Sequence, residues 1–410
     1  MREPKTSLPK ELPDEVAVWC ENAKERRVER LSIHDRDAFT GDGVLNSASK
    51  MNFRQYLLLR VIAPQAKLAF EIYNRQYRYS WIGIRDFDSA VKVLDTQRVW
   101  KLYLKSTKQG TKTGTTILGL FSFVRHYQLE VMKTDGESSL SAPLKIEIDY
   151  TSRTRQRAAQ SQQLVTPIRP RSGRLSLESY TEPSPAVSTP ERPESLSPES
   201  VYEESTSYKA AGDEQIVSTA LILYLNALAF CCTRTPGNWT PRRKAFVVRS
   251  HGKKLYEARV DGYLYSHDNK VEAIVEVKPY ARRSNRVRIG MQEAAQIAAW
   301  IASDPPDRHA ETEYSRVLVS QDHNEIYIII AKFDADYVDY ICGNSFETTS
   351  FLNMQAYGPF RTDDFKHMCS LGNLLLAFMI NRQETYLERE KQRRHEQPMV
   401  AEDDAESEWE

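Results

Sequence analysis

The chain has 410 residues, and its 56 Lys and Arg side chains are balanced by 56 Asp and Glu side chains, so its net charge is near zero. The net charge of the whole chain therefore does not indicate a nucleic-acid-binding protein, and only a local basic surface could attract a phosphate backbone. A hydrophobic fraction of 40% is low for a fully compact chain and favours folded parts diluted by disordered ones.

The cysteine pattern and the apolar runs indicate an intracellular protein. The five cysteines are odd in number and include no CxxC pair, which argues against a disulfide framework or a zinc site and favours a reducing compartment. The start, MREPKTSLPKELPDE, has no apolar core of a signal peptide, and the longest apolar run, ALILYLNALAFCC, is too short to span a bilayer. We therefore expect a nuclear or cytoplasmic protein that does not enter a membrane.

The composition divides the chain into four segments. They are an N-terminal region of unassigned function (1–150), a Ser-, Pro- and Arg-rich linker (151–207), a second folded region (208–388) and a charged tail (389–410). The linker is almost free of aromatic residues and cannot bury enough apolar area to offset its ordering entropy, so we expect it to be disordered. Its Ser-Pro and Thr-Pro pairs and its basic run are ordinary features of such linkers, although phosphorylation or nuclear import would also use them.

The N-terminal region is predicted to be mostly helical. A short helix is expected at 15–30, a helix interrupted at Pro64 at 52–74, and a further helix at 88–106. The alternating stretches FSFVRHYQLEVMK and LKIEIDY predict a β-hairpin after these helices.

The second folded region alternates helices and strands. A helix (AGDEQIVSTALILYLNALAF) is followed by three strands (AFVVRS, LYEARVDGYLY and KVEAIVEVK), a helix (RVRIGMQEAAQIAAWIAS), two strands (RVLVS and EIYIIIAKF) and a last helix for which Thr362 is the expected N-cap. This order predicts an α/β sandwich with a mixed sheet.

The strand KVEAIVEVK carries unusual charges. Because side chains two apart share a face of a strand, Glu276 and Lys278 point the same way, and a tight turn near Asp268 brings the preceding Asp261 beside them. Two close carboxylates repel each other, and a hard divalent cation such as Mg²⁺ relieves that repulsion. The three side chains therefore predict metal-assisted hydrolysis of a phosphodiester, with the lysine positioning or deprotonating the attacking water or neutralising charge on the phosphate.

Asp261 followed by Glu276-Val277-Lys278 resembles the motif of the PD-(D/E)XK nuclease superfamily, with Val260 in place of the motif's proline. The resemblance covers Tyr208 to about Arg382 and is greatest to fungal proteins that carry a nuclease-like domain of this kind. It implies a restriction-endonuclease-like α/β/α core, Mg²⁺ or Mn²⁺ as the cofactor, and DNA or RNA as the substrate.

The resemblance also implies roles for particular residues. The implied catalytic set is Asp261, Glu276, Lys278 and Gln296, and the implied metal ligands are Glu214, Asp261 and Glu276. Gln292 and Arg288 are the implied substrate contacts, and Gln296 with Trp300 is similar to the glutamine-x-x-x-tyrosine element of the lambda-exonuclease branch, with tryptophan replacing tyrosine.

Each of these assignments has a structural alternative. Glu214 suits a helix start because of the helix dipole, the two glutamines suit a solvated helix face, and the arginines of ARRSNRVR suit either phosphate oxygens or a solvated loop. Trp300 is expected in the core. A catalytically inactive nuclease fold that binds nucleic acid or a protein is the alternative function, and a genome-defence effector is a third that the sequence does not separate from the first.

Overall fold

The computed structural model describes residues 8–35, 45–73, 84–108, 118–134, 198–235, 238–306, 312–345 and 347–396. The described residues of 1–136 and 207–410 form one compact unit. The predictions for most of the linker (151–197), for the strand LKIEIDY and for the end of the charged tail lie outside the described residues.

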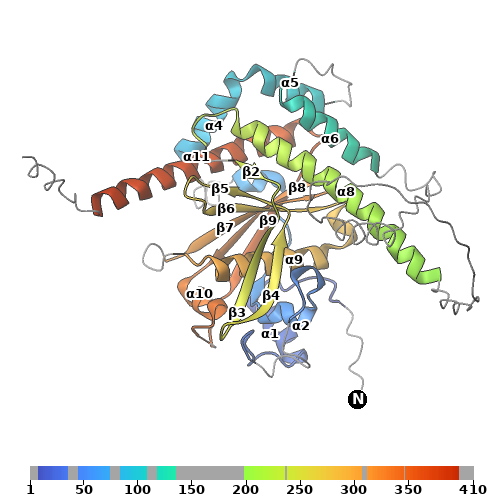
Figure 1. Cartoon of the computed structure of the whole chain (residues 1–410), viewed down its shortest axis with the longest axis vertical. Coiled ribbons are helices and arrows are strands. Elements are labelled where there is room, and N and C mark those ends of the chain that lie inside the picture. The colour runs from blue at the N-terminus through green and yellow to red at the C-terminus, as the bar shows by residue number, and fades with distance from the viewer. Residues whose placement is uncertain are drawn as a thin grey trace, which may run out of the picture. The chain divides into compact units, whose positions relative to one another are not determined.

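The unit is built on a seven-stranded mixed sheet with the strand order β1-β9-β8-β7-β6-β5-β2 (Figure 1). The strands are β1 (Val61–Ile62), β2 (Trp239–Thr240), β5 (Gly262–Tyr265), β6 (Val271–Lys278), β7 (Tyr314–Asp322), β8 (Glu325–Phe333) and β9 (Leu352–Arg361). The pairs β6–β7 and β1–β9 are parallel and the others are antiparallel. The predicted mixed sheet is therefore confirmed.

Nine α-helices of the described residues cover both faces of this sheet (Figure 1). One face carries α4 (Ile84–Thr96), α5 (Arg98–Thr107), α6 (Phe121–Thr134), α8 (Pro198–Ala229) and α11 (Phe365–Glu396). The other carries α1 (Val16–Glu25), α2 (Phe53–Leu58), α9 (Arg286–Ser303), α10 (Ala335–Cys342) and a two-stranded sheet of β3 (Lys244–Ser250) and β4 (Lys253–Val260). Within the described residues, no helix is long and apolar enough to cross a bilayer.

Strand β6 is buried on both faces, as expected for a strand inside a covered sheet. Its Ala273, Val275 and Val277 pack against the core that contains α8 and α11. Ile274 packs in the opposite core with α9, and Glu276 alternates onto that same face. The side chains of Ala273, Val275 and Val277 thus lie on the opposite face of the strand from Glu276.

The N-terminal elements belong to the same two cores as the C-terminal half. Strand β1 pairs with β9, and Ala63 donates its backbone N–H to the Pro13 carbonyl at 2.8 Å. On the sheet face that carries α8 and α11, the buried ring of Trp100 in α5 lies against Gly372 of α11. A methyl group added to that glycine would come within 2.4 Å of the ring. The described part of the N-terminal region thus completes the sheet and its covering layers.

The predicted β-hairpin of the N-terminal region is wrong in its first strand. FSFVRHYQLEVMK forms helix α6, and its buried positions recur at helical spacing: Phe121, Val124, Arg125, Gln128 and Val131. The alternation of apolar and polar residues in this stretch is compatible with both periods, and packing against α5 selects the helix. Likewise, the helix expected at 52–74 is a short α2, strand β1 and a 3₁₀ helix at Ala69–Tyr73.

Several element boundaries in the C-terminal half also differ from the expectation. LYEARVDGYLY is two strands, β4 and β5, which belong to different sheets and meet at Asp261. Two elements have no counterpart in the expected order: α10 and strand β9, which contains YGPF. Pro359 lies where the register of β8 on β9 shifts, between the pair of Ile328 with Tyr357 and the pair of Ile326 with Phe360, and such an irregularity tolerates a residue without a backbone N–H.

Two helix starts differ as well. Helix α8 begins at Pro198, earlier than the expected start at Ala211, so Glu214 lies well inside the helix and the helix-start alternative for it is wrong. The N-cap contact of α11 is made by Asp364, whose carboxylate accepts the His367 backbone N–H at 3.0 Å, and the expected cap Thr362 is buried. The preceding chain runs as strand β9 to Arg361, so the helical turn starts too late for Thr362 to cap it.

Gly372→Ala tests the packing between the N-terminal region and α11. The added methyl group would meet the buried Trp100 ring at 2.4 Å, so we expect the free energy of unfolding to fall by about 1–3 kcal/mol in denaturant titrations. Shortening the opposing ring with Trp100→Phe in the same chain should recover part of this loss, whereas Lys391→Ala on the exposed part of α11 should have little effect. Additive effects of the two core substitutions would contradict the described contact.

Candidate functional site

Asp261 is positioned by the passage of the chain from β4 into β5. Its backbone N–H donates to the Val275 carbonyl at 3.0 Å, and its Oδ2 accepts the Val277 backbone N–H at 3.1 Å. The register of β5 on β6 pairs Gly262 with Val275. These contacts confirm the expected antiparallel hairpin and hold the carboxylate beside the end of β6, with Oδ1 left toward the cleft.

Glu276 is the most buried acid of this group, with its side chain 2% exposed between β6 and α9. Its Oε1 accepts from Lys278 Nζ and Gln292 Nε2, and its Oε2 accepts from Gln296 Nε2. Burial raises the pKa of Glu276 to about 8, and the Asp261 charge adds to the rise, while Lys278 and the Gln296 hydrogen bond oppose it. The carboxylate is therefore held in place by donors but is costly to ionise.

Lys278 lies at the end of β6, with its side chain 12% exposed. Burial disfavours its charge, but the carboxylates of Glu276, Asp261 and Glu214 outweigh burial and hold the pKa of the ammonium above its usual value. Lys278 therefore remains a cation at neutral pH.

The two glutamines of α9 face the site. Gln292 donates to Glu276 and lines the cleft, and Gln296 is fully buried and also donates to the Arg259 carbonyl at 2.7 Å. The solvated-face alternative is thereby excluded for Gln296. Trp300, four residues further along α9, is fully buried in the core, as expected.

Glu214 and Asp261 share a guanidinium. Arg243, in the loop between β2 and β3, places Nη2 at 3.4 Å from Asp261 Oδ1 and at 3.7 Å from Glu214 Oε1. Burial raises the pKa of Glu214, and repulsion from Asp261 adds to the rise, while Lys278 and Arg243 oppose it. Arg243 had no expected role, because the two-residue strand β2 that brings it to Asp261 has no recognisable sequence pattern.

These side chains line one cleft of about 580 Å³. It is bounded by the segment Leu45–Ser49, Glu214 of α8, Arg243 of the β2–β3 loop, strand β4, the end of β6 and the α9 side chain Gln292. Asp261, Glu276, Lys278 and Glu214 all lie on it. Arg288 is exposed on α9 and is absent from the described residues that line the cleft.

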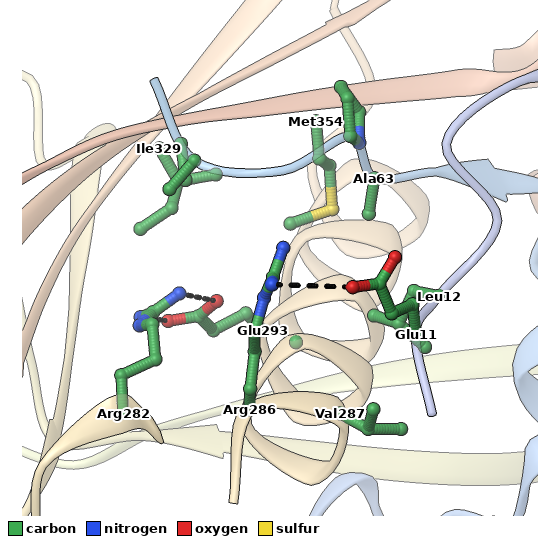
Figure 2. A pocket seen from close by; sticks show the side chains of 13 residues that line it. Glu11, Leu12, Ala63, Arg282, Arg286, Val287, Glu293, Ile329 and Met354 are labelled. Atoms are coloured by element: carbon green, nitrogen blue, oxygen red, sulfur yellow. Dashed lines mark hydrogen bonds and ion pairs between the residues drawn. The ribbon is translucent and has the colours of Figure 1, made fainter. Parts of the chain in front are cut away.

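A second charge cluster lies nearby on the same layer, and Figure 2 shows part of it. Arg282 donates to Glu293 at 3.1 Å and to Asp322 at 2.6 Å, and its guanidinium lies 4.2 Å from the centre of the Tyr327 ring. Burial raises the pKa of Asp322 to about 6, while Arg282 opposes the rise. Arg282 is thus committed to buried acids, which contradicts both the phosphate-binding and the solvated-loop expectations for this arginine.

The small cavity next to this cluster has a volume of about 60 Å³ (Figure 2). It is covered by Glu11 and Leu12 of the N-terminal segment and by Ala63, and Arg286 lies 3.9 Å from Glu11 across it. Among the described residues, this cavity shares no lining residue with the cleft that contains Asp261.

The donor set of the cleft fits a hard divalent cation. Among the described residues, no group of three or more His, Cys, Asp and Glu side chains is arranged to hold a metal ion by itself. Mg²⁺, however, commonly binds one or two carboxylates and keeps several waters. Asp261 and Glu276 would supply these oxygens, and a bound cation would favour the ionised form of Glu276, whose pKa burial raises. Within the described residues, the buried Gln296 Oε1 has no hydrogen-bond donor.

Comparison with known proteins adds no relative. The sequence matches no protein-family model, no curated protein and no solved structure. Inferences about the cleft therefore rest on its residues and geometry.

The pKa of Glu276 predicts a pH dependence of stability. The pKa of Glu276 in the folded chain, about 8, lies above its ordinary value of 4.5. The preference of the folded chain for the protonated acid therefore contributes fully to stability below pH 4.5, and this contribution is lost as the pH rises from 4.5 toward 8. We expect the free energy of unfolding of the native chain, relative to Glu276→Gln, to fall by up to about 1.4 kcal/mol per pH unit across this window in chelator-containing buffer. Lost contacts produce a constant offset, so the slope is the measured quantity, and a flat or rising difference would show that the acid is already ionised.

Proposed function

We propose that the chain is a metal-dependent phosphodiester hydrolase of the PD-(D/E)XK nuclease type that acts on DNA or RNA. The observation that carries this proposal is the convergence of Asp261, Glu276 and Lys278 on one cleft from the two strands of a hairpin. The leading helix α8, the mixed sheet and the glutamine-bearing α9 support a restriction-endonuclease-like core around that hairpin. When bound, Mg²⁺ or Mn²⁺ would polarise the phosphate and make a water more acidic.

Asp261 and Glu276 would hold the cation, with Glu214 as the third carboxylate of the cleft. Asp261 is oriented by the backbone N–H of Val277, so its Oδ1 keeps a fixed direction into the cleft. Glu276 is oriented by the amides of Gln292 and Gln296, which position the acid rather than the substrate. Such preorganisation lowers the cost of assembling the charged site for each turnover.

Lys278 would act as a fixed positive charge. Its pKa is held above the usual value, so the ammonium does not accept a proton at neutral pH. Of the three roles expected from sequence, deprotonation of water is therefore disfavoured, and stabilisation of the negative charge that develops on the phosphate is favoured.

A second candidate, a binding module without catalysis, is favoured by the ion pairs of the cleft. Glu276 is paired with Lys278, while Asp261 and Glu214 share Arg243, so the side chains already neutralise one another. A scaffold of this kind would bind nucleic acid or protein at the cleft without needing a cation.

A cleavage assay separates the two candidates. Full-length protein is incubated with single-stranded and double-stranded DNA and RNA, with Mg²⁺, with Mn²⁺ or with chelator. We expect cleavage of at least one substrate only with metal, and a loss of about 100-fold or more in Lys278→Ala, because the variant loses the charge facing the phosphate.

Lys101→Ala, on the exposed surface of α5, is the matched control and should cleave like the native chain. Thermal melting of each variant checks that the fold is intact. Metal-independent binding of the same substrates without cleavage would instead favour the binding module.

A further inference from the structure

Arg243 occupies the place in the cleft where two acids meet. Its guanidinium lies within 3.4 Å of Asp261 Oδ1 and 3.7 Å of Glu214 Oε1. The second oxygen of Asp261 is already bound to the Val277 backbone N–H. The guanidinium therefore faces the oxygen of Asp261 that a cation in the cleft would use.

The backbone just before Arg243 is paired in a strand, whereas the Arg243 side chain is largely exposed to solvent. Thr240, three residues before Arg243, pairs with Tyr263 of β5. A methyl group added to Gly262 would come within 2.6 Å of the Thr240 carbonyl oxygen, so the start of the loop lies in close contact with β5. The Arg243 side chain itself is 64% exposed. Close backbone contact and a solvated side chain allow the guanidinium to leave the acids without moving the loop.

The ion pairs of Arg243 are weak enough to be exchanged. Both distances exceed that of a good charge-assisted hydrogen bond, and pairs with an exposed partner contribute little net stability. A divalent cation has twice the charge and is a stronger attractor for two carboxylates at the same separation. The cation and the guanidinium cannot both occupy the space between Asp261 Oδ1 and Glu214.

We propose that Arg243 is a displaceable counter-ion: it neutralises Asp261 and Glu214 when no metal is bound, is released by the metal, and then binds a phosphate of the nucleic acid in the cleft. This inference rests on the proposed function, since it takes the metal and the phosphodiester from it. The released guanidinium stays on the cleft wall that also carries Lys254 and Arg259, and its planar donors match phosphate oxygens. Metal and nucleic acid should therefore promote each other's binding through one side chain.

The first test measures binding of Mn²⁺ alone, by calorimetry and by the electron paramagnetic resonance of the free ion. Arg243→Gln removes the competing charge, so we expect Mn²⁺ to bind the full-length variant about threefold to tenfold more tightly than the native chain. Arg242→Gln is the matched control, because this neighbouring arginine is also exposed, and it should leave the Mn²⁺ affinity near that of the native chain. Unchanged or weaker Mn²⁺ binding by Arg243→Gln, including binding by neither protein, would overturn the counter-ion role.

The second test measures binding of a fluorescently labelled single-stranded oligonucleotide to chains carrying Lys278→Ala, which suppresses turnover. With arginine at position 243, we expect Mn²⁺ to strengthen oligonucleotide binding; with Arg243→Gln, most of this enhancement should be lost, while binding in chelator changes little. Equal enhancement in both chains would overturn the phosphate-binding step.

These outcomes are distinguishable from failure of the proposed function. Cleavage can be absent while Mn²⁺ still binds more tightly to Arg243→Gln, which would retain the counter-ion and reject the nuclease. Conversely, metal-dependent cleavage with equal Mn²⁺ affinity in both proteins would retain the nuclease and reject the counter-ion. Melting curves in chelator confirm that the exposed substitution leaves the fold intact.

Discussion

The site depends on one carboxylate buried between the sheet and a helix. Glu276 lies on the α9 face of β6, a strand whose other face is fully apolar. An isolated charge in that layer would be strongly disfavoured. Lys278 from the same strand and Gln292 and Gln296 from helix α9 donate hydrogen bonds to the carboxylate and so offset its desolvation. The spacing of the two glutamines, one turn apart on α9, follows from the need to reach both oxygens of this acid.

Buried charges in this layer are matched in sign and in geometry. Arg282 contacts Glu293 and Asp322 a short distance along the chain from Lys278, so a second ion cluster stabilises the junction between β6 and α9. Breaking such a buried cluster by removing one partner leaves an uncompensated charge. Arg282, which follows Lys278 in sequence, thus supports the position of α9. The arginine that contacts the acids of the cleft is Arg243, in the β2–β3 loop.

The N-terminal region contributes to the site as well as to the fold. Leu45 donates its backbone N–H to the Leu255 carbonyl of β4 at 3.0 Å, which places the segment Leu45–Ser49 along one wall of the cleft. Strand β1 extends the sheet beside β9, and Trp100 packs against α11 on the opposite face. The cleft is therefore a property of both halves of the chain, and a fragment lacking the N-terminal region would expose apolar surface of both cores.

The sequence by itself determined the local arrangement of Asp261, Glu276 and Lys278. Strand alternation and a short hairpin turn are local rules, so the shared face and the antiparallel approach followed from residue spacing alone. The burial of Trp300 was also expected from the sequence, whereas the burial of α9 on all sides from Glu293 to Ile301, Gln296 included, was not. Tertiary structure decided everything that depends on distant partners: the helical state of Phe121–Thr134, the strand state of Leu352–Arg361, the burial of Arg282 and the approach of Arg243 to Asp261. The physical reason is that short or ambiguous patterns have similar local free energies in several conformations, and the contacts that select one come from residues far away in the chain.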